Sequence, residues 1–273
     1  MTTGELLAEP SGVRRVRNPR RNLRFAFDAI IHLVGKEYRS RHRKAYLGWL
    51  WSIGQPLLMF GAFGFFFSKI LTNNIENFPA FLFAGIVLFT WFSKGVTSAT
   101  MSVLTRPDLV YRNNVPLVIA PVVAVLNDLI DLLFALPIAL AITVVSGISI
   151  GPVILFLPLL LFVHFVFTLG LGLICCTANI FARDVRLALD VVLLGWMYAT
   201  PLFYDIANVP GVLHSVIRWN PMSILVMAER GVIVQNKGPE ALPVAVAVAV
   251  SVAVLAIGLL VFNRNSRRFI DKL

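Results

Sequence analysis

The sequence predicts an all-α polytopic membrane protein: six transmembrane helices, an N-terminal amphipathic interfacial helix, and external re-entrant helices before the last span. Of its 273 residues, 58% are hydrophobic and only 14% are charged, with a mean hydropathy of +0.82. A soluble domain of this length would not bury so much apolar surface. In addition, a basic block at residues 36–44 runs directly into residues 46–67, which carry no charge and are long enough to cross a bilayer as a helix. Since basic residues stay inside, this first span should leave the cytoplasm.

Two segments precede the first span. Residues 1–21 are Arg-rich with Gly and Pro, which predicts a disordered, basic cytoplasmic tail. Residues 22–45 should form the amphipathic helix, at the inner membrane interface. Its apolar face would carry Leu23, Phe27, Ile30, Val34 and Tyr38, and its polar face Arg24, Asp28, His32 and Arg39.

The other spans follow from apolar stretches separated by polar loops, within a transmembrane domain of residues 46–262. We expect them at about residues 80–104, 115–145, 153–181, 191–199 and 244–262. The third should be broken by Pro116, Pro121 and Pro137. Residues 105–114 and 182–190 would be cytoplasmic loops, and residues 263–273 a cytoplasmic tail. Residues 205–238 contain apolar stretches of only about 8–12 residues between Pro, Gly and Asn, which predicts a re-entrant segment at the outer face.

The distribution of positive charge supports this topology. The assigned cytoplasmic segments hold 19 of the 24 Lys and Arg residues, and four are assigned outside: Lys69, Arg218, Arg230 and Lys237. We therefore expect a multi-pass protein of the cytoplasmic (inner) membrane with both termini in the cytoplasm. A net charge of +10 could indicate nucleic-acid binding, but contact with anionic membrane lipids explains the distribution better, and no nucleic-acid partner is expected.

No catalytic motif is present. The sequence lacks a phosphate-binding G-x-x-x-x-G-K-[ST] loop, an H-E-x-x-H pair and a G-x-S-x-G elbow. Cys175 and Cys176 are adjacent and have neither disulfide nor metal spacing. We therefore expect no catalytic residue, no metal and no cofactor in this chain, and any uphill transport would take its energy from a partner or an ion gradient.

Polar residues inside spans are expensive in lipid and need an explanation. They are Lys94, Asn127, Asp128 and Asp131. Pairing of the two aspartates with Lys94 or polar backbone is favoured over a proton relay. His164, alone in an apolar span, is expected to form an interhelical hydrogen bond rather than to act as a ligand or proton carrier.

Four motifs, in order along the chain, carry a family resemblance. They are RKAYLGWLWSIGQPLL at 43–58, NIFARDV at 179–185, TPLFY at 200–204, and Asn220-Pro221 followed by Arg230. Together they resemble the permease subunits of type 2 ABC exporters of polysaccharides, the Wzm and TagG group. The amino-acid sequences of these motifs are most similar to those of the actinobacterial branch that exports lipid-linked galactan, as in mycobacteria.

The resemblance implies an assembly of two copies of this permease with two copies of a separate Wzt-like nucleotide-binding ATPase, which would bind MgATP. The cargo would be a polyprenyl-linked polysaccharide of the galactan, O-antigen or teichoic-acid class. Residues 105–114 would form the cytoplasmic coupling helix, and residues 205–238 would contain the external re-entrant helices. The expected ATPase contacts are Arg106, Asp108 and Arg112, supported by Arg183 and Asp184.

The transport path is expected to be a conduit between the two copies, lined by aromatic residues of the first and fifth spans. Sugar rings stack on aromatic faces weakly enough to slide. The candidates are Trp49, Trp51, Phe60, Phe63, Phe67, Trp196, Tyr198 and Tyr204. Trp49 and Trp51 could instead only anchor the membrane interface.

Two other functions remain open on the residues alone. One is an ABC permease for drug or small-lipid efflux, and the other is a membrane-embedded acyl- or glycosyltransferase. The transferase is less favoured because His214 and Asp205 in the external segment lack an obvious catalytic partner. The amphipathic helix and the density of aromatic residues favour a polymer over a small molecule.

Overall fold

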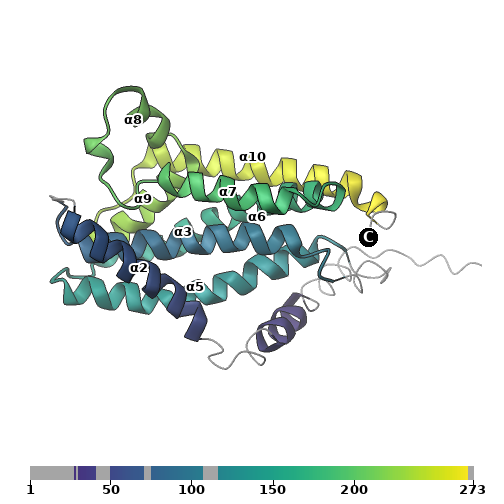
Figure 1. Ribbon diagram of the computed structural model, residues 1–273, viewed down its shortest axis with the longest axis horizontal. Coiled ribbons are helices and arrows are strands. Elements are labelled where there is room, and N and C mark those ends of the chain that lie inside the picture. Colours follow the sequence, from purple (N-terminus) through teal and green to yellow (C-terminus); the bar gives the residue numbers. More distant parts are fainter. Residues whose placement is uncertain (1–27, 29, 41–49, 71–74, 107–115, 270–273) are drawn as a thin grey trace, which may run out of the picture.

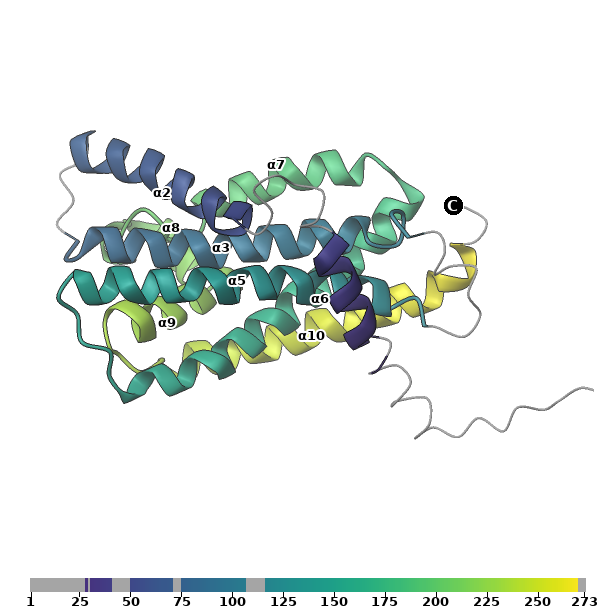
Figure 2. The same cartoon turned by 90° about the horizontal axis from the view of Figure 1, so that it is seen from below.

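The computed structural model describes residues 28, 30–40, 50–70, 75–106 and 116–269, which contain helices and no β-strand. Within these residues, four helical segments are long and apolar enough to cross a membrane. They are α3 (Phe78–Met101), α5 (Ile119–Val145), α6 (Leu157–Phe181) with the preceding turn η1 (Pro152–Phe156), and α10 (Ala241–Asn265) with the following turn η3 (Ser266–Arg268). They lie lengthwise side by side in a bundle (Figures 1 and 2). The described residues therefore confirm an all-helical protein with several apolar helices, and the count of six spans stays a prediction.

The remaining helices are oblique or short. Helix α2 (Leu50–Ile70) crosses the bundle at an angle beside α3 (Figure 2). Helix α7 (Val185–Tyr198) has 14 residues, which corresponds to a length of about 21 Å, short of the roughly 30 Å of a hydrocarbon core. The turn η2 (Ile206–Asn208), α8 (Gly211–Arg218) and α9 (Pro221–Val234) gather at the end of the bundle away from the C-terminus (Figure 1).

Helix α3 lies at the centre of the bundle, and all of its residues from Ala80 to Phe92 are buried. It contacts α2, α5, α6, α7 and α9. Because lipid and helix surfaces are equally apolar, close packing rather than hydrophobicity must hold such a bundle together. Glycines allow this close packing. A Cβ on Gly170 of α6 would lie only 2.6 Å from the Leu255 nitrogen of α10, and a Cβ on Gly172 would lie only 2.5 Å from Ala99 Cβ of α3.

Two local predictions are wrong. The third span is not broken, since α5 continues through Pro121 and Pro137. Pro121 lies in the first turn, where its missing N–H has no intrahelical acceptor anyway, and the bonds of the adjacent turns carry the helix past Pro137. Similarly, residues 182–190 are not a loop throughout, because α7 already begins at Val185 and an ion pair joins Arg186 to Asp190 one turn later.

Residues 30–40, the part of the predicted amphipathic helix that the structure describes continuously, are helical. Ile30, Val34 and Tyr38 are half-buried, whereas His32 and Arg39 are exposed. The Tyr38 ring stacks on Phe134 of α5 with 6.4 Å between centroids. The apolar face of this helix therefore packs against the bundle. The predicted tail at residues 1–21 lies outside the described residues, and the position of the helix at a membrane interface stays a prediction.

Candidate functional site: the junction of α7 and α9

The segment that follows α7 is buried although it is not helical. Residues 200–203, the start of the TPLFY motif, are almost completely inaccessible to solvent. Pro201 disfavours helical conformation at Thr200 and so ends α7, and the Thr200 hydroxyl donates back to the Trp196 carbonyl at 2.9 Å. This leaves backbone carbonyls of α7 and of the buried turn without helical donors.

Asn220 and Ser223 of the α9 N-terminus satisfy part of that backbone. The Asn220 carboxamide donates to the Ala199 carbonyl at 3.2 Å, and the Ser223 hydroxyl reaches the same oxygen at 3.4 Å. Asn220 Oδ1 accepts from the backbone N–H of Met222 and from the Trp196 indole, each at 3.1 Å. Asn220 is therefore both the N-cap of α9 and its link to the end of α7.

Arg230 makes a second link from the same helix. Its guanidinium donates to the Pro201 carbonyl at 2.7 Å and lies over the Phe81 ring of α3, 3.4 Å from the centroid. The side chain is only 4% exposed, so Arg230 is a buried residue of α9. A buried cation is tolerated here because a carbonyl and an aromatic face replace water. Two of the motifs, TPLFY and Asn220 with Arg230, thus form one structural unit.

A buried ionisable pair lies beside this unit. His164 Nδ1 of α6 is 3.1 and 3.2 Å from the two carboxylate oxygens of Glu229, and both side chains are fully buried. The His164 ring also packs edge-on against Trp91 of α3, with 4.5 Å between centroids. The expected interhelical hydrogen bond of His164 is confirmed. Its partner Glu229 was not predicted; the available signal was an acidic residue in an otherwise apolar stretch just before Arg230.

The predicted aromatic residues divide into two groups. Around Phe203, the Phe63 ring lies at 4.6 Å and the Tyr198 ring at 6.1 Å between centroids, and the Tyr204 hydroxyl donates to the Tyr198 carbonyl at 3.0 Å. Phe60 packs on Phe83, and Trp196 packs on Phe92 and Phe167. These neighbours in α3 and α6 are buried, as Phe203 is. Trp49, and the side chains of Trp51 and Phe67, lie outside the described residues.

Those predicted ATPase contacts that the structure describes lie at the other end of the bundle. Arg106, just after α3, forms an ion pair with Glu37 of the amphipathic helix. Asn179 of the NIFARDV motif donates at 3.4 Å to the Thr100 carbonyl, which ties the end of α6 to the end of α3. Arg183 and Asp184 are exposed and directly precede α7, whose first turn lies at the same end (Figure 2). Asp108 and Arg112 lie outside the described residues, so the contact with an ATPase stays a prediction.

The polar residues inside the spans lie on neighbouring helices. Lys94 is half-buried on α3, and Asn127, Asp128 and Asp131 are buried on α5. The two helices pack together at this level, since a Cβ on Gly95 would lie 3.7 Å from Val125 Cγ1. Lys94 and Asp128 therefore have the matched depth that pairing requires.

We expect Lys94→Met to lower the amount of protein in the membrane more than the double change with Asp128→Asn does. A single charge left unpaired inside the bundle costs several kcal/mol, and removing both charges relieves that cost. Membrane abundance of tagged variants measures the difference. Equal loss from the single and the double variant would contradict the pairing.

Comparison with known proteins places this geometry in a family. Residues 28–234 match the model of the ABC-2 type transporter family. The chain belongs to this family. The match includes α2 to α9, and with them the whole junction described above.

Several known proteins are similar to this ABC-2 family member over nearly its whole length. It is 26% identical over 251 residues to the O-antigen export system permease protein RfbA of Myxococcus xanthus, covering 89% of this chain and 95% of the relative. It is 24% identical to a protein of the same name from Klebsiella pneumoniae, covering 92% and 96%. It is also 24% identical to the polysialic acid transport protein KpsM of Escherichia coli, covering 86% and 92%. ABC-2 permeases work with an ATPase subunit and are not enzymes themselves.

Proposed function

We propose that this chain is the membrane-spanning permease subunit of an ATP-driven exporter of polysaccharide. The observation that carries the proposal is the nearly full-length similarity to permeases named for the export of O-antigen and to a protein named for the transport of polysialic acid. Both of these are sugar polymers, so drug or small-lipid efflux is not favoured. The similarity also accounts for the absence of a phosphate-binding loop, because ATP would be hydrolysed on the partner.

The finer proposal concerns the assembly and the cargo. Two copies of the permease would work with two copies of a Wzt-like ATPase in the cytoplasmic membrane. The cargo would be a polyprenyl-linked polysaccharide of the galactan, O-antigen or teichoic-acid class. The sequences of the four motifs favour a galactan. The buried unit made by TPLFY, Asn220 and Arg230 would then position the outer helices α8 and α9 relative to α7 in each copy.

Coupling to the ATPase is testable through residues 105–114. Replacing them by a Gly/Ser linker should abolish polymer export and uncouple ATP hydrolysis from transport, since this segment joins α3 to α5 at the end where Arg183 and Asp184 also lie. Export of labelled polymer and ATPase activity of the copurified complex are the measurements. Replacing residues 235–239, which join α9 to α10 at the other end, is the matched control and should spare ATPase association. Full export from the 105–114 variant, or ATP hydrolysis by the purified permease alone, would refute this role.

The proposed conduit is testable through the aromatic residues around Phe203. Phe63→Ala, Tyr198→Ala and Tyr204→Ala together should reduce export while assembly and basal ATPase activity remain. Each stacking contact with a sugar contributes on the order of 0.5–1.5 kcal/mol, so the triple change should slow export about tenfold or more. Phe156→Ala with Phe162→Ala, at two exposed aromatic positions, serves as the control. Unchanged export by the triple variant at normal expression would place the path elsewhere.

A further inference from the structure

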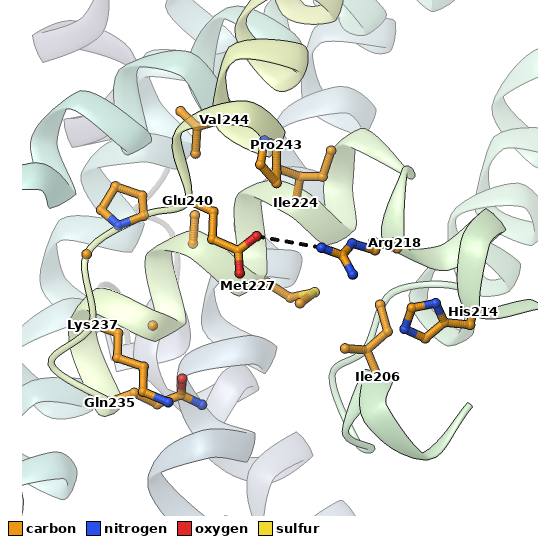
Figure 3. A pocket seen from close by; sticks show the side chains of 14 residues that line it. Ile206, His214, Arg218, Ile224, Met227, Gln235, Lys237, Glu240, Pro243 and Val244 are labelled. Atoms are coloured by element: carbon orange, nitrogen blue, oxygen red, sulfur yellow. Dashed lines mark ion pairs between the residues drawn. The ribbon is translucent and has the colours of Figure 1, made fainter. Parts of the chain in front are cut away.

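A cavity of about 250 Å³ lies between α8, α9 and the start of α10, apart from the junction of α7 and α9 (Figure 3). Much of its lining is apolar and includes Ile206, Ile224, Met227 and Val244. Ligand pockets for drug-sized molecules occupy about 300–1,000 Å³. This cavity is therefore large enough for a head group but not for a whole amphiphile.

The polar lining of the cavity is mainly basic. His214 and Arg218 come from α8, and Lys237 comes from the connection between α9 and α10. Glu240 is the one carboxylate among the lining residues, and it lies 3.8 Å from the Arg218 guanidinium (Figure 3). At that distance the ion pair is loose, so the Arg218 donors remain available to another anion. No carboxylate of the described residues forms a salt bridge with Lys237 within 4 Å.

The surface beside the cavity is apolar. Val212, Leu213 and Val216 of α8 are 62–80% exposed, and Trp219 follows them with nearly half of its surface exposed. A short helix with an exposed apolar face and an adjacent Trp is typical of the boundary between hydrocarbon and head groups. The cavity thus combines a basic site with a neighbouring surface for an acyl or prenyl chain.

We propose that this cavity binds the phosphate head group of an anionic lipid. Arg218 and Lys237 would hold the phosphate, with a ring nitrogen of His214 as a further donor, and the hydrocarbon chain would leave along the apolar face of α8. A sugar ring fits less well, because the described lining residues include no Phe, Tyr or Trp on which it could stack. The inference rests on the membrane location of the proposed exporter. The phosphate could belong to a membrane phospholipid or to the polyprenyl carrier of the cargo.

Lipid binding to the purified permease–ATPase complex tests the proposal. Native mass spectrometry would compare phosphatidylglycerol, a polyprenyl phosphate and, as the uncharged control, phosphatidylcholine. We expect one or both anionic lipids to bind in preference to phosphatidylcholine. Arg218→Gln with Lys237→Gln should weaken that binding at least tenfold, whereas Glu240→Gln, which removes a competing anion, should preserve or strengthen it.

Arg264→Gln is the matched control, because it removes one exposed positive charge at the opposite end of α10. It should leave binding unchanged. If the double variant does not assemble, Lys237→Gln alone carries the test, since that side chain is exposed. Three results would each contradict the proposed site: binding of phosphatidylcholine as strong as that of the anionic lipids, unchanged binding of anionic lipid in the Lys237 variant, or a loss with Arg264→Gln equal to that in the Lys237 variant.

The two lipid sources and the two proposals are separable. Binding of phosphatidylglycerol but not polyprenyl phosphate identifies a resident phospholipid, and the reverse identifies the carrier of the cargo. Normal polymer export by a complex that binds no anionic lipid would refute lipid binding in the cavity but would leave the proposed function intact. Lipid binding without polymer export by the wild-type complex would support the cavity and refute the proposed function.

Discussion

Glu229→Ala should be among the most destabilising single changes in the described part of the chain. It removes the partner of His164 where both side chains are fully buried, with a distance of 3.1 Å between Nδ1 and the carboxylate. Breaking a buried pair by removing one member typically costs about 3–5 kcal/mol, because the remaining group stays without solvent or partner. Thermal unfolding of the detergent-purified protein, followed by size-exclusion fluorescence, measures the loss.

A double-mutant cycle measures the interaction energy between Glu229 and His164 separately from the contacts that each makes with its surroundings. His164→Ala together with Glu229→Ala should cost less than the sum of the two single changes, because the second change removes the group that the first left unpaired. Glu240→Ala, at an exposed carboxylate, is the control and should shift stability by only about 0.5 kcal/mol or less. Additive effects of the two buried changes would show that the pair is not energetically coupled.

Gly170→Ala should destabilise the packing of α6 on α10. The new Cβ would lie 2.6 Å from the Leu255 nitrogen and 2.8 Å from Leu255 Cα. These are backbone atoms, so a side-chain rotation cannot relieve the overlap and the helices must move apart. Overpacking of this kind costs about 1–3 kcal/mol, and Gly170→Leu should cost more. Thermal unfolding and the yield of assembled complex report the effect.

Gly195→Ala is the matched control for that change. Gly195 is also in a helix, α7, but a Cβ there would meet no atom within 4 Å. Alanine exceeds glycine in helix propensity by about 1 kcal/mol, so this variant should be neutral or slightly stabilised. If the two Gly→Ala changes had equal effects on stability, close approach of α6 and α10 at Gly170 would not be a determinant of the fold.

The sequence alone determined the helices that depend on local properties. The spans corresponding to α3, α5, α6 and α10 could be placed within a few residues, because span length and the exclusion of charge are properties of each stretch by itself. The end of α7 was also predictable, since Pro201 prevents continuation of the helix. In the same way, the alternation of apolar and charged residues predicted the helix over residues 30–40.

Only the tertiary structure decided which faces of these helices meet. In a membrane protein the lipid and the protein interior are both apolar, so the hydrophobic pattern does not distinguish a face that contacts lipid from one that contacts a neighbouring helix. The burial of Arg230 against Phe81, and the ring contacts of Phe63 with Phe203 and of Trp196 with Phe92, could therefore not be predicted from the sequence. The same holds for the pairing of Glu229 with His164, which lie 65 residues apart, because this contact exists only once α9 packs against α6.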